Sequence, residues 1–193
     1  TNFTDYFEKG DGGAVHIINC GLDCTSISFN RCVSTNGGGG AIYIRNSYEL
    51  QHNITIKNTS FIKCQALYGG ACYFYSNLES NGVQIISSYF SQNVATERKG
   101  TTENNNLFGG NHIFVTAKNL HIFDSKFEKG KGSGGSVKIY NVFDQVDGRA
   151  TKLDKTQNHI LIIGCNFELD KGAKTSINFI DEIERQKIKE EIF

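Results

Sequence analysis

One pattern recurs along almost the whole chain, and it constrains the fold more than any other feature of the sequence. Each copy has a strand of alternating apolar and polar residues, a Phe beside a small polar residue or Cys, a variable loop, and Gly-Gly before a second alternating strand. The clearest copy runs from Ile54 to Phe74 as ITIKNTSFIKCQALYGGACYF. Because neither strand is long enough to bury its apolar face alone, we expect the copies to stack on one another.

The phenylalanine of the pattern occurs in six copies. The interval between copies is short from Phe7 to Phe29 and long from Phe127 to Phe167, which is too uneven for a closed propeller and typical of a solenoid with variable loops. The sequence therefore predicts an all-β fold, a parallel β-helix of about six irregular coils. Its interior is expected to contain a stack of Phe7, Phe29, Phe61, Phe90, Phe127 and Phe167.

The Gly-Gly pairs are expected at tight corners between strands, because glycine adopts a positive φ without strain. The chain has no proline, which fits strands whose N–H groups all join a ladder. An ordinary β-sandwich is the alternative fold, but the strands of a sandwich do not require the same sequence pattern to recur. The predicted corner glycines are Gly12, Gly13, Gly39, Gly40, Gly69, Gly70, Gly109, Gly110, Gly134 and Gly135.

The two ends of the chain differ from the repeats. We expect residues 1–180 to form the β-helix and residues 181–193, DEIERQKIKEEIF, to form a short capping α-helix or a linker. Asp181 is the candidate N-cap of that helix. The chain starts at Thr1 and contains no methionine, so we expect a piece of a longer or processed protein.

Composition excludes several classes of function. The formal net charge is zero, which removes the basic footprint of nucleic-acid binding. Apolar runs such as 160–163 are far shorter than a membrane span. The segment GKGSGG at 130–135 matches a dinucleotide fingerprint, but a strand pattern follows it instead of a helix. No Cys-x-x-Cys occurs, so we expect neither a metal nor a cofactor.

Cysteines and sequons suggest modification. Cys32 and Cys64 both lie three residues after a repeat Phe, so they should meet in neighbouring coils at a distance that permits a disulfide. Cys20 and Cys24 form the other close pair, and buried free thiols remain the alternative in both places. Three sequons make Asn2, Asn53 and Asn58 candidate glycosylation sites.

Enzymatic hydrolysis of a carbohydrate would need two carboxylates facing one cleft. The candidates are Glu128, Glu168 and Asp170, which follow a repeat Phe closely and alternate with lysines. That mixture indicates a charge-balanced surface instead of a catalytic pair. The loops 95–107 and 142–158, which break the period, are better candidates for recognition of a partner.

The phrase Gly-Gly-Ala-Ile at 39–42, with related copies at Gly12 and Gly69 and a Phe-x-x-Asn partner at Phe90 and Asn93, resembles the polymorphic outer membrane protein repeat of chlamydiae. The repeat also occurs in surface-protein families of trichomonads and other eukaryotic microbes. The resemblance implies a right-handed β-helix displayed on a surface and commonly discussed in adhesion.

Together these features predict a non-enzymatic module at the cell surface or outside the cell, with a structural or adhesive role. Its ligand would be a protein or a glycan, and end-to-end or lateral contacts with other proteins are expected. Two alternatives remain, a carbohydrate-active β-helix enzyme and a structural subunit of a larger assembly.

Overall fold

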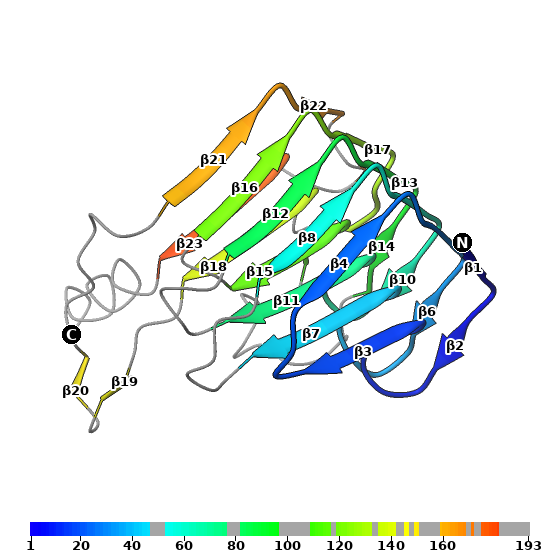
Figure 1. The fold of residues 1–193 in the computed structure, drawn as a ribbon, viewed down its shortest axis with the longest axis horizontal. Coiled ribbons are helices and arrows are strands. Elements are labelled where there is room, and N and C mark those ends of the chain that lie inside the picture. The colour runs from blue at the N-terminus through cyan, green and yellow to red at the C-terminus, as the bar shows by residue number, and fades with distance from the viewer. Residues whose placement is uncertain are drawn as a thin grey trace.

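The structure is a computed structural model of the chain. It describes residues 1–46, 53–76, 82–96, 109–116, 119–132, 135–141, 145–146, 149–150, 159–168, 171 and 175–181. These residues are all-β, and their strands pair in parallel within stacked sheets (Figure 1). The predicted all-β fold with parallel stacking is confirmed, and the arrangement agrees with a parallel β-helix.

Four parallel sheets run along the stack, and we name them sheets A to D. Sheet A contains β1 (Asn2–Thr4), β5 (Ser28–Asn30), β9 (Ser60–Ile62), β13 (Tyr89–Ser91), β17 (Lys126–Glu128) and β22 (Asn166–Phe167). Sheet B contains β2 (Phe7–Glu8), β6 (Val33–Ser34), β10 (Gln65–Ala66) and β14 (Val94–Ala95).

Sheets C and D carry the longer strands. Sheet C contains β3 (Val15–Ile18), β7 (Ile42–Asn46), β11 (Cys72–Ser76), β15 (Ile113–Thr116), β18 (Val137–Asn141) and β23 (Ile177–Asp181). Sheet D contains β4 (Leu22–Thr25), β8 (Ile54–Lys57), β12 (Gly82–Ile86), β16 (Asn119–Phe123) and β21 (His159–Ile163). A separate antiparallel pair joins β19 (Gln145–Val146) to β20 (Arg149–Ala150).

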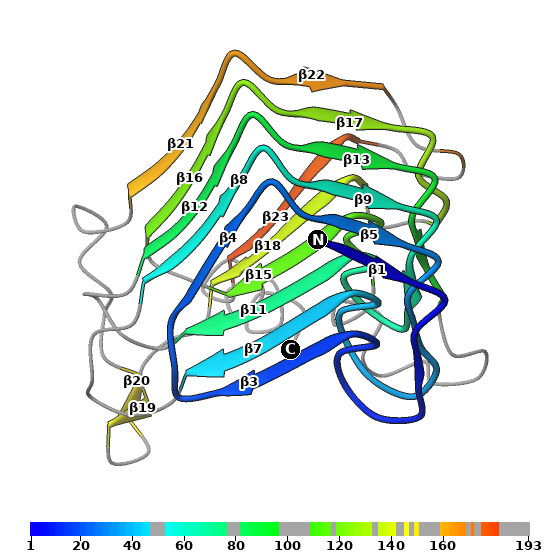
Figure 2. The same cartoon turned by 45° about the vertical axis from the view of Figure 1, so that its right-hand side comes forward.

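Each coil visits the sheets in the order D, A, B and C, as the run from β8 to β11 illustrates. Single residues with positive φ turn the chain between sheets, such as Asn58 between D and A and Lys63 between A and B. The same positions in the next coil are Ser87 and Gln92. The bends between sheets D and A therefore lie above one another in a row (Figure 2).

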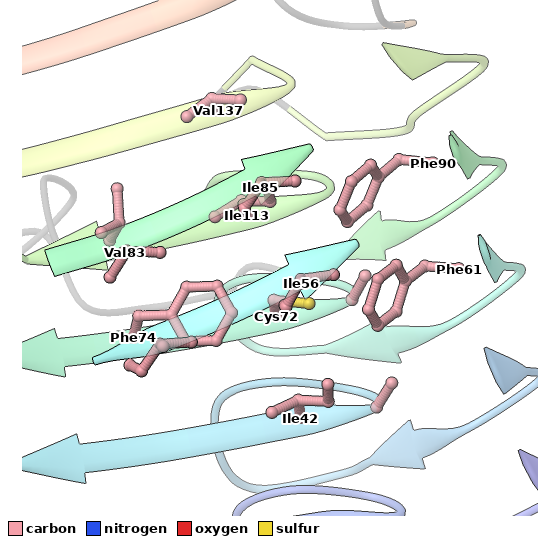
Figure 3. Packing of buried hydrophobic residues seen from close by; sticks show 14 of the residues in the cluster. Ile42, Ile56, Phe61, Cys72, Phe74, Val83, Ile85, Phe90, Ile113 and Val137 are labelled. Atoms are coloured by element: carbon pink, nitrogen blue, oxygen red, sulfur yellow. The ribbon is translucent and has the colours of Figure 1, made fainter. Parts of the chain in front are cut away.

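The core consists of columns of like residues from successive coils (Figure 3). In sheet C, for example, Cys72 pairs with Ile42 on one side and Ile113 on the other, and Ile113 pairs with Val137. All four side chains are fully buried. A strand with a neighbouring coil on each side keeps its apolar side chains out of contact with water. The short strands are therefore stable only within the stack.

The phenylalanine stack exists, but its first member is Phe3 and not Phe7. Phe7 lies in β2 of sheet B, pairs with Val33, and is 63% exposed. Phe3 pairs with Phe29 in sheet A, and Asp5 takes the corner position that Arg31 takes in the next coil. The stacked rings Phe3, Phe29, Phe61, Phe90, Phe127 and Phe167 lie with centroids 5.0, 5.0, 4.7, 4.8 and 4.7 Å apart.

The glycine corners connect sheets B and C, with a shift in the later coils. Gly70 N donates to Gly110 O, and Asn111 N donates to Gly135 O. Hence Asn111 takes the second corner position in its coil, and the predicted pair Gly109–Gly110 lies one residue too early. The predicted pair Gly134–Gly135 shifts in the same way, and Gly134 itself lies outside the described residues.

The predicted C-terminal helix is not supported. The described residues contain no helix, and Asp181, the expected N-cap, is the last residue of strand β23. Residues 182–193 lie outside the described residues.

Candidate functional site

The corner between sheets A and B contains a column of buried polar side chains. Asn93 is fully buried, and its Nδ2 donates to Phe61 O at 3.0 Å while its Oδ1 accepts from Cys64 N at 2.8 Å. In the coils before it, Cys64 and Cys32 direct their thiols at the carbonyls of Phe29 and Phe3. The Asn and Cys residues of the repeat therefore fasten one coil to the preceding one.

A second polar column, which the repeat pattern did not predict, lies at the corner between sheets D and A. Ser88 Oγ donates to Ile86 O and accepts from Thr59 N, and Ser125 Oγ accepts from Ser88 N. All three hydroxyl residues are buried. A buried polar group is costly unless it is hydrogen-bonded, and these hydroxyls meet that need by joining successive coils.

Glu128, a candidate catalytic carboxylate, is held by neighbours in its own and the preceding coil. Its side chain is 9% exposed, with Lys126 Nζ at 2.5 Å from Oε2 and Lys129 Nζ at 3.7 Å from Oε1. The hydroxyl of Tyr89 donates to Oε1 at 2.5 Å, and Ser91 Oγ is 3.4 Å away. The hydrogen bonds from Lys126 and Tyr89 lower the pKa of Glu128 to about 2.

Of the other two candidate carboxylates, the structure describes Glu168. Glu168 follows Glu128 in the next coil, because Phe127 pairs with Phe167 and Glu168 N donates to Phe127 O. Glu168 is exposed, and Asp170 lies outside the described residues. A general acid needs a raised pKa near neutrality, and the pKa of Glu128 is moved in the opposite direction.

The stability of the protein is expected to depend on Glu128 at acid pH. A glutamate titrates near 4.3 in an unfolded chain. Because the pKa of Glu128 is about 2 in the folded protein, its ionisation stabilises the fold fully at pH values above about 4.3. The stabilisation is lost as the pH falls from about 4.3 towards 2. Urea unfolding at pH 7 and pH 3 measures this, and the wild type should lose more stability than E128Q across that range.

The matched control for this measurement is E168Q, because Glu168 is exposed in the neighbouring coil. It should keep the pH dependence of the wild type. An E128Q variant whose stability falls with pH as steeply as that of the wild type would contradict the ionic role of Glu128.

The outer face of sheet C carries a cluster of aromatic residues. Tyr43 and Tyr73 stack with centroids 4.9 Å apart, and Phe114 stacks on Tyr73 at 5.3 Å. Tyr68 lies tilted against Tyr73 and Phe114 at 5.1 and 6.1 Å. We call Tyr43, Tyr68, Tyr73, Tyr75 and Phe114 the aromatic face. Tyr43, Tyr73, Tyr75 and Phe114 lie opposite the core because they alternate with core residues along the strands of sheet C.

The hydroxyls of Tyr43 and Tyr73 remain protonated at physiological pH. Burial, followed by the charge of Asp11, raises the pKa of Tyr43 to about 12. Burial also raises the pKa of Tyr73 well above its usual value. Arg45 lies over the ring of Tyr75 with its Cζ 5.7 Å from the centroid. The face therefore combines the buried Tyr43 and the half-buried Tyr68, Tyr73 and Tyr75 with an exposed cation, Arg45, and the nearby carboxylate of Asp11.

The cysteines are six free thiols in the structure. The bridges Cys32–Cys64 and Cys20–Cys24 stay predictions, and Cys32 and Cys64 do lie in neighbouring coils. Cys20 is exposed and Cys24 is buried in sheet D, so these two side chains point to different surroundings.

The three sequon asparagines are all exposed. Asn58 occupies a corner with a φ of 49°, and the hydroxyl of Ser60 in the same sequon donates to Ser28. Asn53 Oδ1 accepts from Gly82 N at 3.4 Å. Glycosylation of Asn2, Asn53 and Asn58 stays a prediction.

The two period-breaking loops lie mostly outside the described residues. Only Ala95 and Thr96 of loop 95–107 are described, together with the short strands β19 and β20 of loop 142–158. Among the residues that the structure describes, no group of three His, Cys, Asp or Glu side chains could hold a metal ion. In the same part of the chain, no helix is long and apolar enough to cross a bilayer.

Comparisons with known proteins were made at three levels. No family model, no curated protein and no solved structure gives a significant match. The function must therefore be argued from the chain's own geometry.

Proposed function

We propose that the chain is a non-enzymatic, surface-displayed β-helix module with a structural or adhesive role outside the cell. The aromatic face is the observation that carries this proposal. The polar side chains at the corners and Glu128 are engaged in contacts between coils, whereas Tyr68, Tyr73 and Tyr75 keep part of their surface accessible. The resemblance to the polymorphic outer membrane protein repeat supports display, and right-handed winding follows the usual preference of parallel connections.

The chemistry of the aromatic face suits recognition of a protein or a glycan. Tyrosine offers a large contact area at a low cost in side-chain entropy, and its hydroxyl adds a hydrogen bond. Arg45 is exposed beside Tyr75, so a charged or polar partner can pair with its guanidinium. A rigid stack of coils keeps these groups preorganised, which reduces the entropy lost on binding.

The proposal is tested by binding of the purified chain to a panel of immobilised matrix proteins and extracellular glycans. For the partner that binds, the double variant R45A/Y75A should weaken affinity at least tenfold, about 1.4 kcal/mol. The control is Lys57→Ala, because Lys57 is exposed on the outer face of sheet D. Failure to bind any member of the panel, or equal losses in both variants, would refute the aromatic face as the adhesive surface.

The carbohydrate-active enzyme remains the second candidate, because Glu128 and Glu168 occupy neighbouring coils about one strand spacing apart. Release of reducing ends from polysaccharides by the wild type, abolished in both E128Q and E168Q, would establish it and replace the adhesive proposal. The ion pairs of Glu128 are the reason that we expect no release.

A structural subunit is the third candidate. The first coil exposes Phe7 and Ile18, at 63% and 51%, and the last exposes Ile163 at 56%. Apolar residues on the end coils could pack against another protein. A molar mass that rises with protein concentration in light scattering, and that rises less in the I18S variant, would favour this role.

A further inference from the structure

Cys32 and Cys64 face each other across two successive coils. On one side of them Asn30 pairs with Ile62, and on the other side Val33 pairs with Gln65. The register continues between these pairs, because Gln65 N donates to Cys32 O at 3.0 Å. Neighbouring strands lie about 4.8 Å apart, which falls within the Cα separations of disulfide-bonded cysteines, about 4.4–6.8 Å.

The two thiols also share their surroundings. Both residues are fully buried, and each thiol points towards main-chain carbonyls of its own and the preceding coil. The thiols interact with each other, which lowers the pKa of Cys32 and raises that of Cys64. The two thiols are therefore close enough in the fold to influence each other, which the strand register alone also implies.

Strand register places no other cysteine beside Cys24 or Cys72. Cys24 pairs with Ile56 in sheet D, and Cys72 lies between Ile42 and Ile113 in sheet C. Cys20 is exposed next to the corner residue Asn19. Cys165 follows the corner residue Gly164, at the position that Ser125 takes in the preceding coil. The column after the repeat Phe is therefore the place where two cysteines meet.

We propose that Cys32 and Cys64 form a modification site, a disulfide cross-link between successive coils made by exchange with a small disulfide oxidant such as glutathione disulfide. One of the two thiolates attacks the oxidant, forms a mixed disulfide and releases one reduced thiol. The other thiolate then attacks the protein sulfur of the mixed disulfide, which forms the intramolecular bond and releases the second reduced thiol. The protein loses two electrons and two protons, and the oxidant gains them.

Burial determines when this reaction occurs. An oxidant cannot reach either sulfur in the folded stack, so the exchange takes place while the coils assemble or when they open. Once formed, the bridge is shielded from reductants by the same packing. Oxidation should therefore be efficient during refolding and slow on the folded, reduced protein.

The test is to refold the whole chain with reduced and oxidised glutathione, and separately with dithiothreitol, and then to alkylate in denaturant. The oxidised sample should carry two fewer alkyl groups than the reduced one, and peptide mapping should join Cys32 to Cys64. Because the mapping uses the unaltered chain, it does not depend on whether any variant folds. Six alkylated cysteines in the oxidised sample, or a bridge elsewhere, would overturn the proposal.

Thermal unfolding provides the second readout. Oxidation should raise the melting temperature by roughly 5–15 °C, because the bridge restricts the unfolded chain. The rise should vanish in C64S and persist in C24S, a matched control in which a buried thiol of the same core is replaced. Equal rises in both variants would place the effect of oxidation at other cysteines.

Discussion

Replacement of Phe61 by Ala should lower the free energy of unfolding by about 3–5 kcal/mol, as expected for removal of a buried aromatic ring. The Phe61 side chain is fully buried, and its ring stacks between those of Phe29 and Phe90 at 5.0 and 4.7 Å. The cavity would open in the middle of the stack, where coils on both sides are fixed by strand pairing and cannot collapse into it. Urea unfolding followed by circular dichroism measures the change.

The matched control is Phe7→Ala. Phe7 fits the repeat pattern as well as Phe61 does, but it is 63% exposed in sheet B. We expect its replacement to cost less than about 1 kcal/mol. A loss well under 1 kcal/mol for Phe61→Ala, or a larger loss for Phe7→Ala, would contradict the assignment of the stack.

The phenylalanine stack could be predicted from the sequence because equivalent residues of the repeat occupy equivalent positions in every coil. The prediction failed at the first copy, where Phe3 and Phe7 both lie near Gly12. Which of the two enters the stack depends on the corner residue that follows it, and Asp5 has the positive φ that fixes this choice. Single corner residues of this kind carry no strong sequence signature when they are not glycine.

The repeated sequence pattern contained a signal for the aromatic face. An aromatic or imidazole ring lies three residues after the second corner position in four successive coils, at His16, Tyr43, Tyr73 and Phe114. The shift of the corner to Gly110–Asn111 hides the last of these from a search for Gly-Gly. Strand alternation then places the rings on the outer face of sheet C.

The environment of Glu128 could not be read from the sequence. Its pKa depends on the hydroxyl of Tyr89, which is contributed by the preceding coil across a loop of variable length. Only the register of β13 with β17, in which Ser91 pairs with Glu128, brings the two side chains together. The spacing of residues along the chain identified the candidate carboxylates. The strand register between coils determines which side chains contact them.

Replacement of Gly40 by Ala should destabilise the fold by about 3 kcal/mol or more, because the added methyl group meets main-chain atoms that cannot rotate away. An ideal Cβ at Gly40 would lie 2.2 Å from Gly70 O and 2.6 Å from Gln65 N. Both atoms belong to the adjoining coil, and Gly40 N itself donates to Gly69 O. The coils would have to separate at this corner, which would weaken the ladders on both sides of it.

Gly10→Ala is the control, since the nearest atom to a Cβ there is Glu8 Oε1 at 4.0 Å. Its stability should be unchanged or slightly raised, because alanine restricts the unfolded chain. Comparing the stability of G40A with that of G10A separates the effect of the close approach of two coils from the general effect of replacing a glycine. If G40A unfolds at the same urea concentration as G10A, the second corner glycine is not required by packing, and the Gly-Gly phrase would reflect only the positive φ of Gly39. In a later coil Asn111 takes the equivalent position, and its side-chain Nδ2 donates to Gly132 O at 3.1 Å.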